Sequence, residues 1–220
     1  MMPFARIPRH VGFIPDGNRR WADIQGLCRG EGYAPGIEPG LRLLDLCRDL
    51  GIQEVSIYGF TQENVRRPSE QVEKFRAACT EFGRRAIEAG AALLAVGDRD
   101  SSLFPDDLRC FAETRSAGDL RVNLLVNYGW QWDLFSALKQ ARANGGVTYS
   151  AAPQALASGQ IPRVDLVVRW GGHRRLSGFL PLQCAYADFY VIDALWPDSR
   201  PEQLLDALAW YQAQDVTLGG

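Results

Sequence analysis

Lysine is almost missing from this chain of 220 residues, where Lys74 and Lys139 are the only lysines among the 24 basic residues. The others are arginines, whose planar guanidinium groups suit bidentate recognition of phosphate, although a base-composition bias of the genome would give the same pattern. A net charge of -2 and a pI of about 5.7 leave no positive excess for binding a polyanion. The composition therefore argues against a nucleic-acid partner and leaves a small polyphosphate ligand open.

The chain also lacks long apolar runs and paired cysteines. No run approaches the roughly 20 residues that span a bilayer, and residues 1–9 carry arginine and proline without the apolar stretch of a signal peptide. We therefore expect no transmembrane segment and a cytoplasmic location. The five cysteines form no CxxC pair, which gives little support to a disulfide framework or a zinc ribbon.

Short apolar runs alternate with longer segments of helical periodicity, which is typical of an α/β protein. The pattern predicts strands at residues 11–14, 54–58, 92–97, 122–126, 166–169 and 189–192. It predicts helices at residues 39–50, 69–91, 103–114, 132–143 and 201–212, and a surface loop with one short helix at 144–159. We expect one domain over residues 1–220, built on a single, mostly parallel six-stranded sheet flanked by helices.

Polar residues follow the first predicted strand, at the sheet edge where ligands of open α/β sheets bind. Asp16 can hold a divalent cation, Gly17 lets the backbone approach a ligand, and the next amides open a helix whose N-terminus favours an anion. Arg19 and Arg20 add positive charge. The segment matches neither the GxxxxGK[ST] nor the GxGxxG phosphate-binding pattern, and on its own a plain tight turn explains it equally well.

A second polar loop follows the fifth predicted strand. Gly171 and Gly172 precede His173, Arg175 and Ser177, which would form another anion pocket beside the first. Two such pockets indicate two phosphorylated substrates. One carboxylate suits Mg²⁺, which completes its coordination with diphosphate oxygens and water. His173 is equally compatible with an ordinary surface histidine.

Five ordered motifs resemble those of the cis-prenyltransferase family, whose best-known members make undecaprenyl diphosphate. Residues 10–22 read HVGFIPDGNRRWA and resemble the opening HVAxIMDGNxRWA signature, and residues 57–68 read IYGFTQENVRRP and are similar to YAFSxENWxRP. Residues 122–129, 165–172 and 185–198 follow in the same order. The resemblance therefore runs nearly from end to end.

The resemblance implies a homodimer and a magnesium-dependent condensation of isoprenoid diphosphates, and it assigns roles to residues. Asp16 and Asp188 would bind Mg²⁺, and Asp16, Asn64 and His173 would be catalytic. The diphosphate of the allylic substrate would be held by Gly17, Asn18, Arg20 and Arg29, and the reacting carbons would be bordered by Phe60, Thr61 and Asn64. Further substrate-binding residues would be Arg19, Trp21, Tyr33 and Arg67. The diphosphate of the second substrate would be held by Arg169, Arg175 and Ser177.

Several positions depart from the family pattern. His173 to Arg175 replace Glu-His-Arg, Asp188 replaces a metal-binding Glu, Tyr33 replaces a histidine, and residues 215–220 lack the arginine-rich turn that precedes a Gly-Gly pair. These changes fall around the expected acceptor site, which favours irregular, head-to-middle coupling of small allylic diphosphates. The compact chain favours a C10–C15 product, with cyclisation left open. Ordinary head-to-tail elongation with isopentenyl diphosphate is the alternative, and a non-catalytic partner subunit is a second one that the retained Asp16 and Asn64 oppose.

Overall fold

In the computed structural model, which describes residues 4–143, 146, 148 and 152–215, one sheet forms the centre of the chain. The strands are β1 (His10–Ile14), β2 (Glu54–Tyr58), β3 (Ala91–Val96), β4 (Leu120–Leu125), β5 (Leu166–Arg169) and β6 (Asp188–Val191). Their order is β3-β4-β2-β1-β5-β6, and every neighbouring pair is parallel. The predicted six-stranded α/β architecture is confirmed, and the sheet is wholly parallel.

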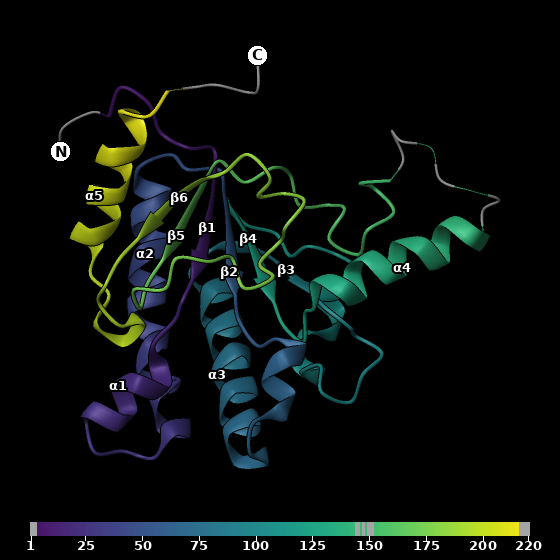
Figure 1. The fold of residues 1–220 in the computed structure, drawn as a ribbon, viewed down its shortest axis with the longest axis horizontal. Helices are drawn as coiled ribbons and strands as arrows, with labels where there is room; N and C mark the ends of the chain where they lie inside the picture. Colours follow the sequence, from purple (N-terminus) through teal and green to yellow (C-terminus); the bar gives the residue numbers. More distant parts are fainter. Residues whose placement is uncertain (1–3, 144–145, 147, 149–151, 216–220) are drawn as a thin grey trace.

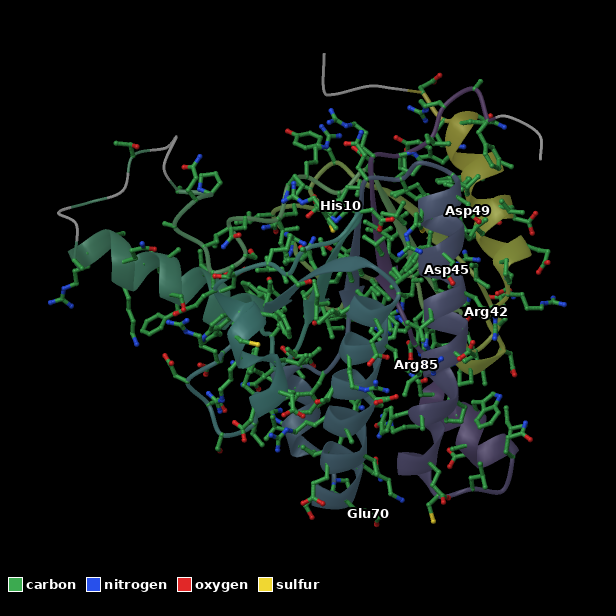
Figure 2. All side chains as sticks on the ribbon, turned by 180° about the vertical axis from the view of Figure 1, so that it is seen from behind. His10, Arg42, Asp45, Asp49, Glu70 and Arg85 are labelled. Atoms are coloured by element: carbon green, nitrogen blue, oxygen red, sulfur yellow. The ribbon has the colours of Figure 1, made fainter. Side chains whose placement is uncertain are left out.

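Three long helices cover one face of the sheet, as Figures 1 and 2 show from opposite sides. They are α2 (Ile37–Asp49), α3 (Ser69–Glu88) and α5 (Pro201–Gln212), and their apolar residues share one core with β1, β2 and β4. The other face packs against the loop that contains Phe179 and Leu180 and against the start of α4 (Trp130–Ala143), which projects from the body (Figure 1). The short helix α1 (Asn18–Ile24) follows β1 directly.

Five 3-10 helices complete the described elements: η1 (Arg29–Gly32), η2 (Ala34–Gly36), η3 (Gln62–Arg66), η4 (Asp106–Ala112) and η5 (Trp196–Asp198). The segment predicted as a helix at residues 103–114 forms the shorter 3-10 helix η4, which begins directly after Pro105. A 3-10 helix is the usual form of such a short connector. The helix predicted to reach residue 91 ends at Glu88, because Gly90 adopts a φ of 90° and turns the chain into β3.

The loop predicted at residues 144–159 is only partly described. Residues 152–159 form successive turns and bends rather than a short helix. Residues 144, 145, 147 and 149–151 lie outside the described part of the chain, as does the segment from 216 to 220 in which the sequence departs from the family pattern. Over the described residues, no helix is long and apolar enough to cross a membrane.

Candidate active site

A cleft of about 500 Å³ opens where the carboxyl ends of β1, β2 and β5 meet. In the sheet order, β1 stands between β2 and β5, so the chain leaves β1 toward one side and later returns on the other. Ligands bind at such points of parallel sheets because the diverging connections leave a crevice. The location is therefore the one that the strand pattern predicted.

The loop after β1 is held in a conformation that requires glycine. Gly17 has a φ of 107°, and a Cβ on it would lie 2.7 Å from Leu195 Cδ2. Asn18 Nδ2 donates a hydrogen bond to the Pro15 carbonyl oxygen at 3.0 Å, and the Trp196 amide donates to the Asp16 carbonyl oxygen at 3.0 Å. These bonds fix the backbone at the point where Asp16 faces the cleft.

Asp16 is paired with two arginines from different parts of the chain. Arg169 Nη2, at the end of β5, donates to Asp16 Oδ2 at 2.7 Å, and Arg20 Nη2 lies 3.5 Å from Oδ1. Burial on its own would raise the pKa of Asp16, but the hydrogen bond and charge of Arg169, together with the charge of Arg20, lower it below its usual value. The carboxylate is therefore ionised at neutral pH.

Arg169 connects the two polar loops that the sequence singled out. Its side chain is only 4% exposed, and its Nη1 donates to Ser177 Oγ at 2.8 Å and to the Arg175 carbonyl oxygen. Tyr58 donates from its hydroxyl to the Ser177 carbonyl oxygen at 2.9 Å, and Ser177 itself adopts a φ of 53°. The Nε atom of Arg169 is buried without a hydrogen-bond partner. Arg169 lines the cleft, and its guanidinium gives this side of the cleft a positive charge suited to an anion.

The loop after β2 supplies the third wall. Thr61 precedes η3, and its amide donates to Asn64 Oδ1 at 3.1 Å, so the two residues form a capping box. Arg67 follows η3 and donates from Nη1 to the Tyr33 hydroxyl at 2.8 Å. These contacts place Asn64 and Arg67 opposite the β1 loop, across the cleft.

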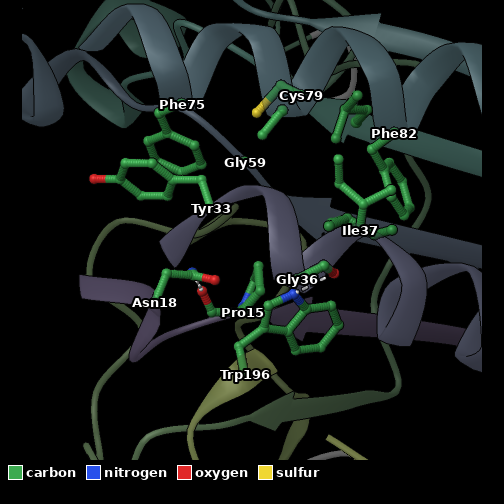
Figure 3. Close-up of a pocket in the computed structure, with 13 residues that line it drawn as sticks. Pro15, Asn18, Tyr33, Gly36, Ile37, Gly59, Phe75, Cys79, Phe82 and Trp196 are labelled. Carbon is green, nitrogen blue, oxygen red and sulfur yellow. Dashed lines mark hydrogen bonds between the residues drawn. The ribbon is translucent and has the colours of Figure 1, made fainter. Parts of the chain in front are cut away.

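A smaller apolar cavity of about 50 Å³ adjoins the cleft, between the sheet and helices α2 and α3 (Figure 3). Tyr33 and Phe75 stand at one end of it, and Ile37 and Phe82 at the other. Pro15, Asn18, Tyr33, Gly59 and Phe75 line both spaces. A polar space for charged groups thus continues into an apolar one.

Most of the predicted site residues line the cleft. They are Asp16, Gly17, Asn18, Arg19, Arg20, Arg29, Tyr33, Thr61, Asn64, Arg67, Arg169, His173, Arg175 and Ser177. Glu63 and Tyr58 line it as well and were missed, although Tyr58 ends β2 and Glu63 lies between two predicted residues. Tyr58 could have been predicted, because it is the last residue of a predicted strand and the carboxyl ends of the strands mark the site.

Three predicted site residues lie away from the cleft. Trp21 donates from Nε1 to Asp198 Oδ1 at 2.8 Å, and Phe60 is fully buried with its ring edge against Phe75, 5.8 Å between centroids. Asp188 begins β6 and pairs with Leu166, the first residue of β5, so it lies at the amino edge of the sheet. Burial raises the pKa of Asp188, with only partial compensation from Arg6 and Arg163. The fold of this chain therefore does not bring Asp16 and Asp188 together, and their joint metal binding stays a prediction.

The donor set at Asp16 fits Mg²⁺. Among the described residues, no group of three His, Cys, Asp or Glu side chains gathers closely enough to hold a metal ion. A metal here would take one ionised carboxylate from the protein and the rest of its ligands from water and substrate oxygens, which is the coordination that Mg²⁺ prefers. The surrounding arginines favour a polyanionic substrate that would bring those oxygens.

The chain matches a family model described as "Putative undecaprenyl diphosphate synthase" over residues 14–219. It is 33% identical to a ditrans,polycis-undecaprenyl-diphosphate synthase ((2E,6E)-farnesyl-diphosphate specific) of Pseudomonas putida, covering 97% of this chain and 91% of the relative. It is 32% identical to an isoprenyl transferase of Heliobacterium mobile, covering 98% of this chain and 88% of the relative.

Solved structures have the same fold. A crystal structure of lavandulyl diphosphate synthase from Lavandula x intermedia, in complex with dimethylallyl diphosphate, superposes with a TM-score of 0.85 at 25% identity, covering 97% of this chain and 98% of that one. A crystal structure of a probable undecaprenyl diphosphate synthase from Campylobacter jejuni gives a TM-score of 0.79 at 23% identity, covering 98% and 100%. The fold that the motifs implied is therefore confirmed.

Proposed function

Because this chain belongs to the cis-prenyltransferase family of undecaprenyl diphosphate synthases, and is therefore a prenyltransferase, we propose that it condenses small isoprenoid diphosphates into a short C10–C15 product. Dimethylallyl or geranyl diphosphate would be the allylic substrate, and diphosphate would be released. The preferred mode is irregular, head-to-middle coupling, with cyclisation of the product as a further option.

The small apolar cavity beside the cleft carries the proposal of a short product. Its volume is about 50 Å³, about a third of the roughly 150 Å³ of an engineered apolar cavity that holds one benzene molecule. A prenyl tail of one or two C5 units would lie in the mouth of the cleft, and a long polyprenyl tail would have no space beyond it. Ile37 and Phe82 close the far end against further growth.

The residues of the cleft account for recognition of two diphosphates. Gly17, Asn18, Arg20 and Arg29 lie on the side of α1 and would hold the diphosphate of the allylic substrate, and Arg169, Arg175 and Ser177 lie on the side of β5 and would hold that of the second substrate. The preformed arrangement stabilises the charge that develops on the leaving diphosphate oxygen. Asp16 lies between the two groups, in contact with Arg169 and close to Arg20.

In the proposed reaction, the bond between the allylic carbon and the diphosphate oxygen breaks, and the electron pair stays on the oxygen. The double bond of the second substrate supplies the electron pair for the new carbon–carbon bond. The carbocation that this leaves on the second substrate then loses a proton from carbon. Asp16 would hold Mg²⁺, which neutralises charge on the diphosphate when bound. Asn64 and Thr61 would border the reacting carbons, and His173 lies on the β5 side of the cleft, where it would accept the proton or contact phosphate.

Two observations support irregular coupling. His173 occupies the cleft at a position where the family pattern has a different residue, on the side of the proposed acceptor. The chain also resembles, over nearly its whole length, a lavandulyl diphosphate synthase whose structure holds dimethylallyl diphosphate. The names of the bacterial relatives favour head-to-tail elongation, which is the competing result of the test below.

A homodimer is part of the same proposal. The outer face of α4 exposes Leu134, Phe135 and Leu138, each more than 40% accessible, on a helix that projects from the body (Figure 1). A group of large apolar side chains on one exposed face marks an interaction surface. We propose that a second copy of this chain covers it. The cytoplasmic location expected from the sequence stays a prediction.

The test of the coupling mode is a product analysis by mass spectrometry and NMR. The purified chain is incubated with Mg²⁺ and dimethylallyl diphosphate alone, and in parallel with added isopentenyl or geranyl diphosphate. A branched, head-to-middle product from allylic substrate alone supports irregular coupling. A product that forms only when isopentenyl diphosphate is present, and that has a linear skeleton, would return the chain to ordinary elongation.

A further inference from the structure

A stacked pair of aromatic rings stands at the boundary between the polar cleft and the apolar cavity. The centroids of Tyr33 and Phe75 lie 4.3 Å apart with only 3° between the ring planes. Both rings line both spaces, and Figure 3 shows them side by side at the end of the cavity opposite Phe82. A chain extending from a diphosphate in the cleft toward the cavity therefore meets this pair first.

The pair is held from two sides. Behind Phe75, the fully buried Phe60 presents its ring edge, 5.8 Å between centroids and 87° between planes. In front, Arg67 donates to the Tyr33 hydroxyl at 2.8 Å, and its guanidinium carbon lies 5.7 Å from the centre of the Phe75 ring. Tyr33 itself is only 4% exposed. Moving Tyr33 would break the stacking contact and the hydrogen bond from Arg67, and moving Phe75 would break the stacking contact and the contact with Phe60, so the pair resists displacement.

Arg67 also faces the cleft, where the proposed function places a diphosphate. A guanidinium has five N–H donors, so Arg67 can hold the Tyr33 hydroxyl with one and still offer others to an anion. Arg67 would thus both contact the diphosphate head of the substrate and hold the Tyr33 ring at the entrance for its tail.

We propose that the Tyr33–Phe75 stack is the specificity-determining element that limits the length of the prenyl tail, an inference that rests on the proposed prenyl transfer. A C5 tail remains on the cleft side of the rings. A longer tail reaches the cavity only by displacing them, and the lost stacking opposes the gain from burying its extra carbons. The pair selects against long allylic substrates and stops growth of the product.

The inference is tested by binding, which needs no turnover. Dissociation constants of dimethylallyl and farnesyl S-thiolodiphosphate, unreactive analogues with C5 and C15 tails, are measured by calorimetry with Mg²⁺. The proteins are the wild type, Phe75→Leu, Phe75→Ala, Tyr33→Phe and the matched control Phe82→Leu, which changes the far end of the same cavity. Circular dichroism confirms that each variant is folded, and the leucine variant keeps the test available if the alanine variant does not fold.

For both Phe75 variants we expect the preference for the C5 analogue over the C15 analogue to fall by about tenfold or more, because access for two further methylene groups is worth that much. We expect little change in Phe82→Leu, and an intermediate change in Tyr33→Phe, which keeps the stack and loses the bond to Arg67. If the wild type binds the C5 analogue and the Phe75 variants keep its preference, the stack is not the determinant. If the wild type binds neither analogue, the proposed function falls and the inference with it.

Discussion

At the residue scale, the ion pair between Asp16 and Arg169 links the two halves of the proposed site. Arg169 comes from the end of a buried strand and is nearly inaccessible, while Asp16 is about one-third exposed to the cleft. The tight turn after β1 suggests that Asp16 contributes little to stability, but its contact with a buried guanidinium indicates otherwise, because an arginine deprived of its acceptor is costly. Function and stability are therefore coupled at this position.

Two substitutions of Asp16 separate those effects. Asp16→Asn keeps an oxygen for Arg169 and removes the charge, so we expect turnover to fall by about a hundredfold or more, with a smaller loss of stability than in Asp16→Ala. Asp16→Ala should lose at least as much turnover and, in addition, about 1–3 kcal/mol of stability. Rates of diphosphate release and urea unfolding curves measure both quantities. Turnover of Asp16→Asn at the wild-type rate would contradict the role given to this carboxylate.

At the scale of elements, the strands carry polar side chains as well as apolar ones. His10 on β1 contacts Ser56 Oγ on β2 at 2.8 Å through Nε2, and Asn123 on β4 donates from Nδ2 to the same oxygen at 2.9 Å and to Glu54 Oε1 at 2.7 Å. His10 Nδ1 donates to the Arg163 carbonyl oxygen at 3.1 Å. His10 is labelled in Figure 2. This buried network connects three adjacent strands and suits a neutral imidazole whose Nε2 accepts a hydrogen bond from the Ser56 hydroxyl.

The network predicts a dependence of stability on pH. Burial lowers the pKa of His10 below 6.5, and the charges of Glu54 and Asp165 oppose this only in part. At a pH between the pKa of His10 in the folded chain and that in the unfolded chain, the unfolded chain binds a proton that the folded chain does not. The contribution of His10 to the free energy of unfolding is therefore fully present above about pH 6.5 and is lost as the pH decreases. Urea unfolding at pH 7.5, 6.5 and 5.5 measures the effect. His10→Gln should be less stable at pH 7.5 and should lose less on acidification, and an equal loss in both proteins would exclude His10 as the source.

The elements also show how much of the structure the sequence predicts. Continuous apolar runs locate all six strands. The predicted start of the fourth strand at residue 122 is two residues late, because Arg121 interrupts the apolar pattern, and β4 begins at Leu120. The strand ends locate the cleft. Sequence spacing does not show that Asp188 opens its strand at the opposite edge, since this follows from the register of β6 on β5. It also does not reveal the stack of Tyr33 on Phe75, because Tyr33, between η1 and η2, meets Phe75 on α3 only after folding.

At the scale of the whole molecule, the exposed apolar face of α4 gives a prediction about assembly. Phe135 is 57% and Leu138 is 59% exposed, so a charge at either position should cost the monomer little. If a second copy covers this face, Phe135→Glu combined with Leu138→Glu should convert a dimer into a monomer. Light scattering coupled to size-exclusion chromatography measures the mass. The matched control is Gln140→Glu, which adds a charge at an exposed residue on the opposite side of the same helix, and equal masses for all proteins would contradict the proposed interface.

In the proposed function, the size of the apolar space is the property of the whole molecule that would limit the product to C10–C15. The most direct measurement is the length of the product, determined by mass spectrometry after the chain is supplied with Mg²⁺, isopentenyl diphosphate and either dimethylallyl, geranyl or farnesyl diphosphate. The account predicts products of C10–C15 from the two smaller allylic substrates and little reaction of the C15 one. A series of long polyprenyl diphosphates, formed most rapidly from farnesyl diphosphate, would contradict it.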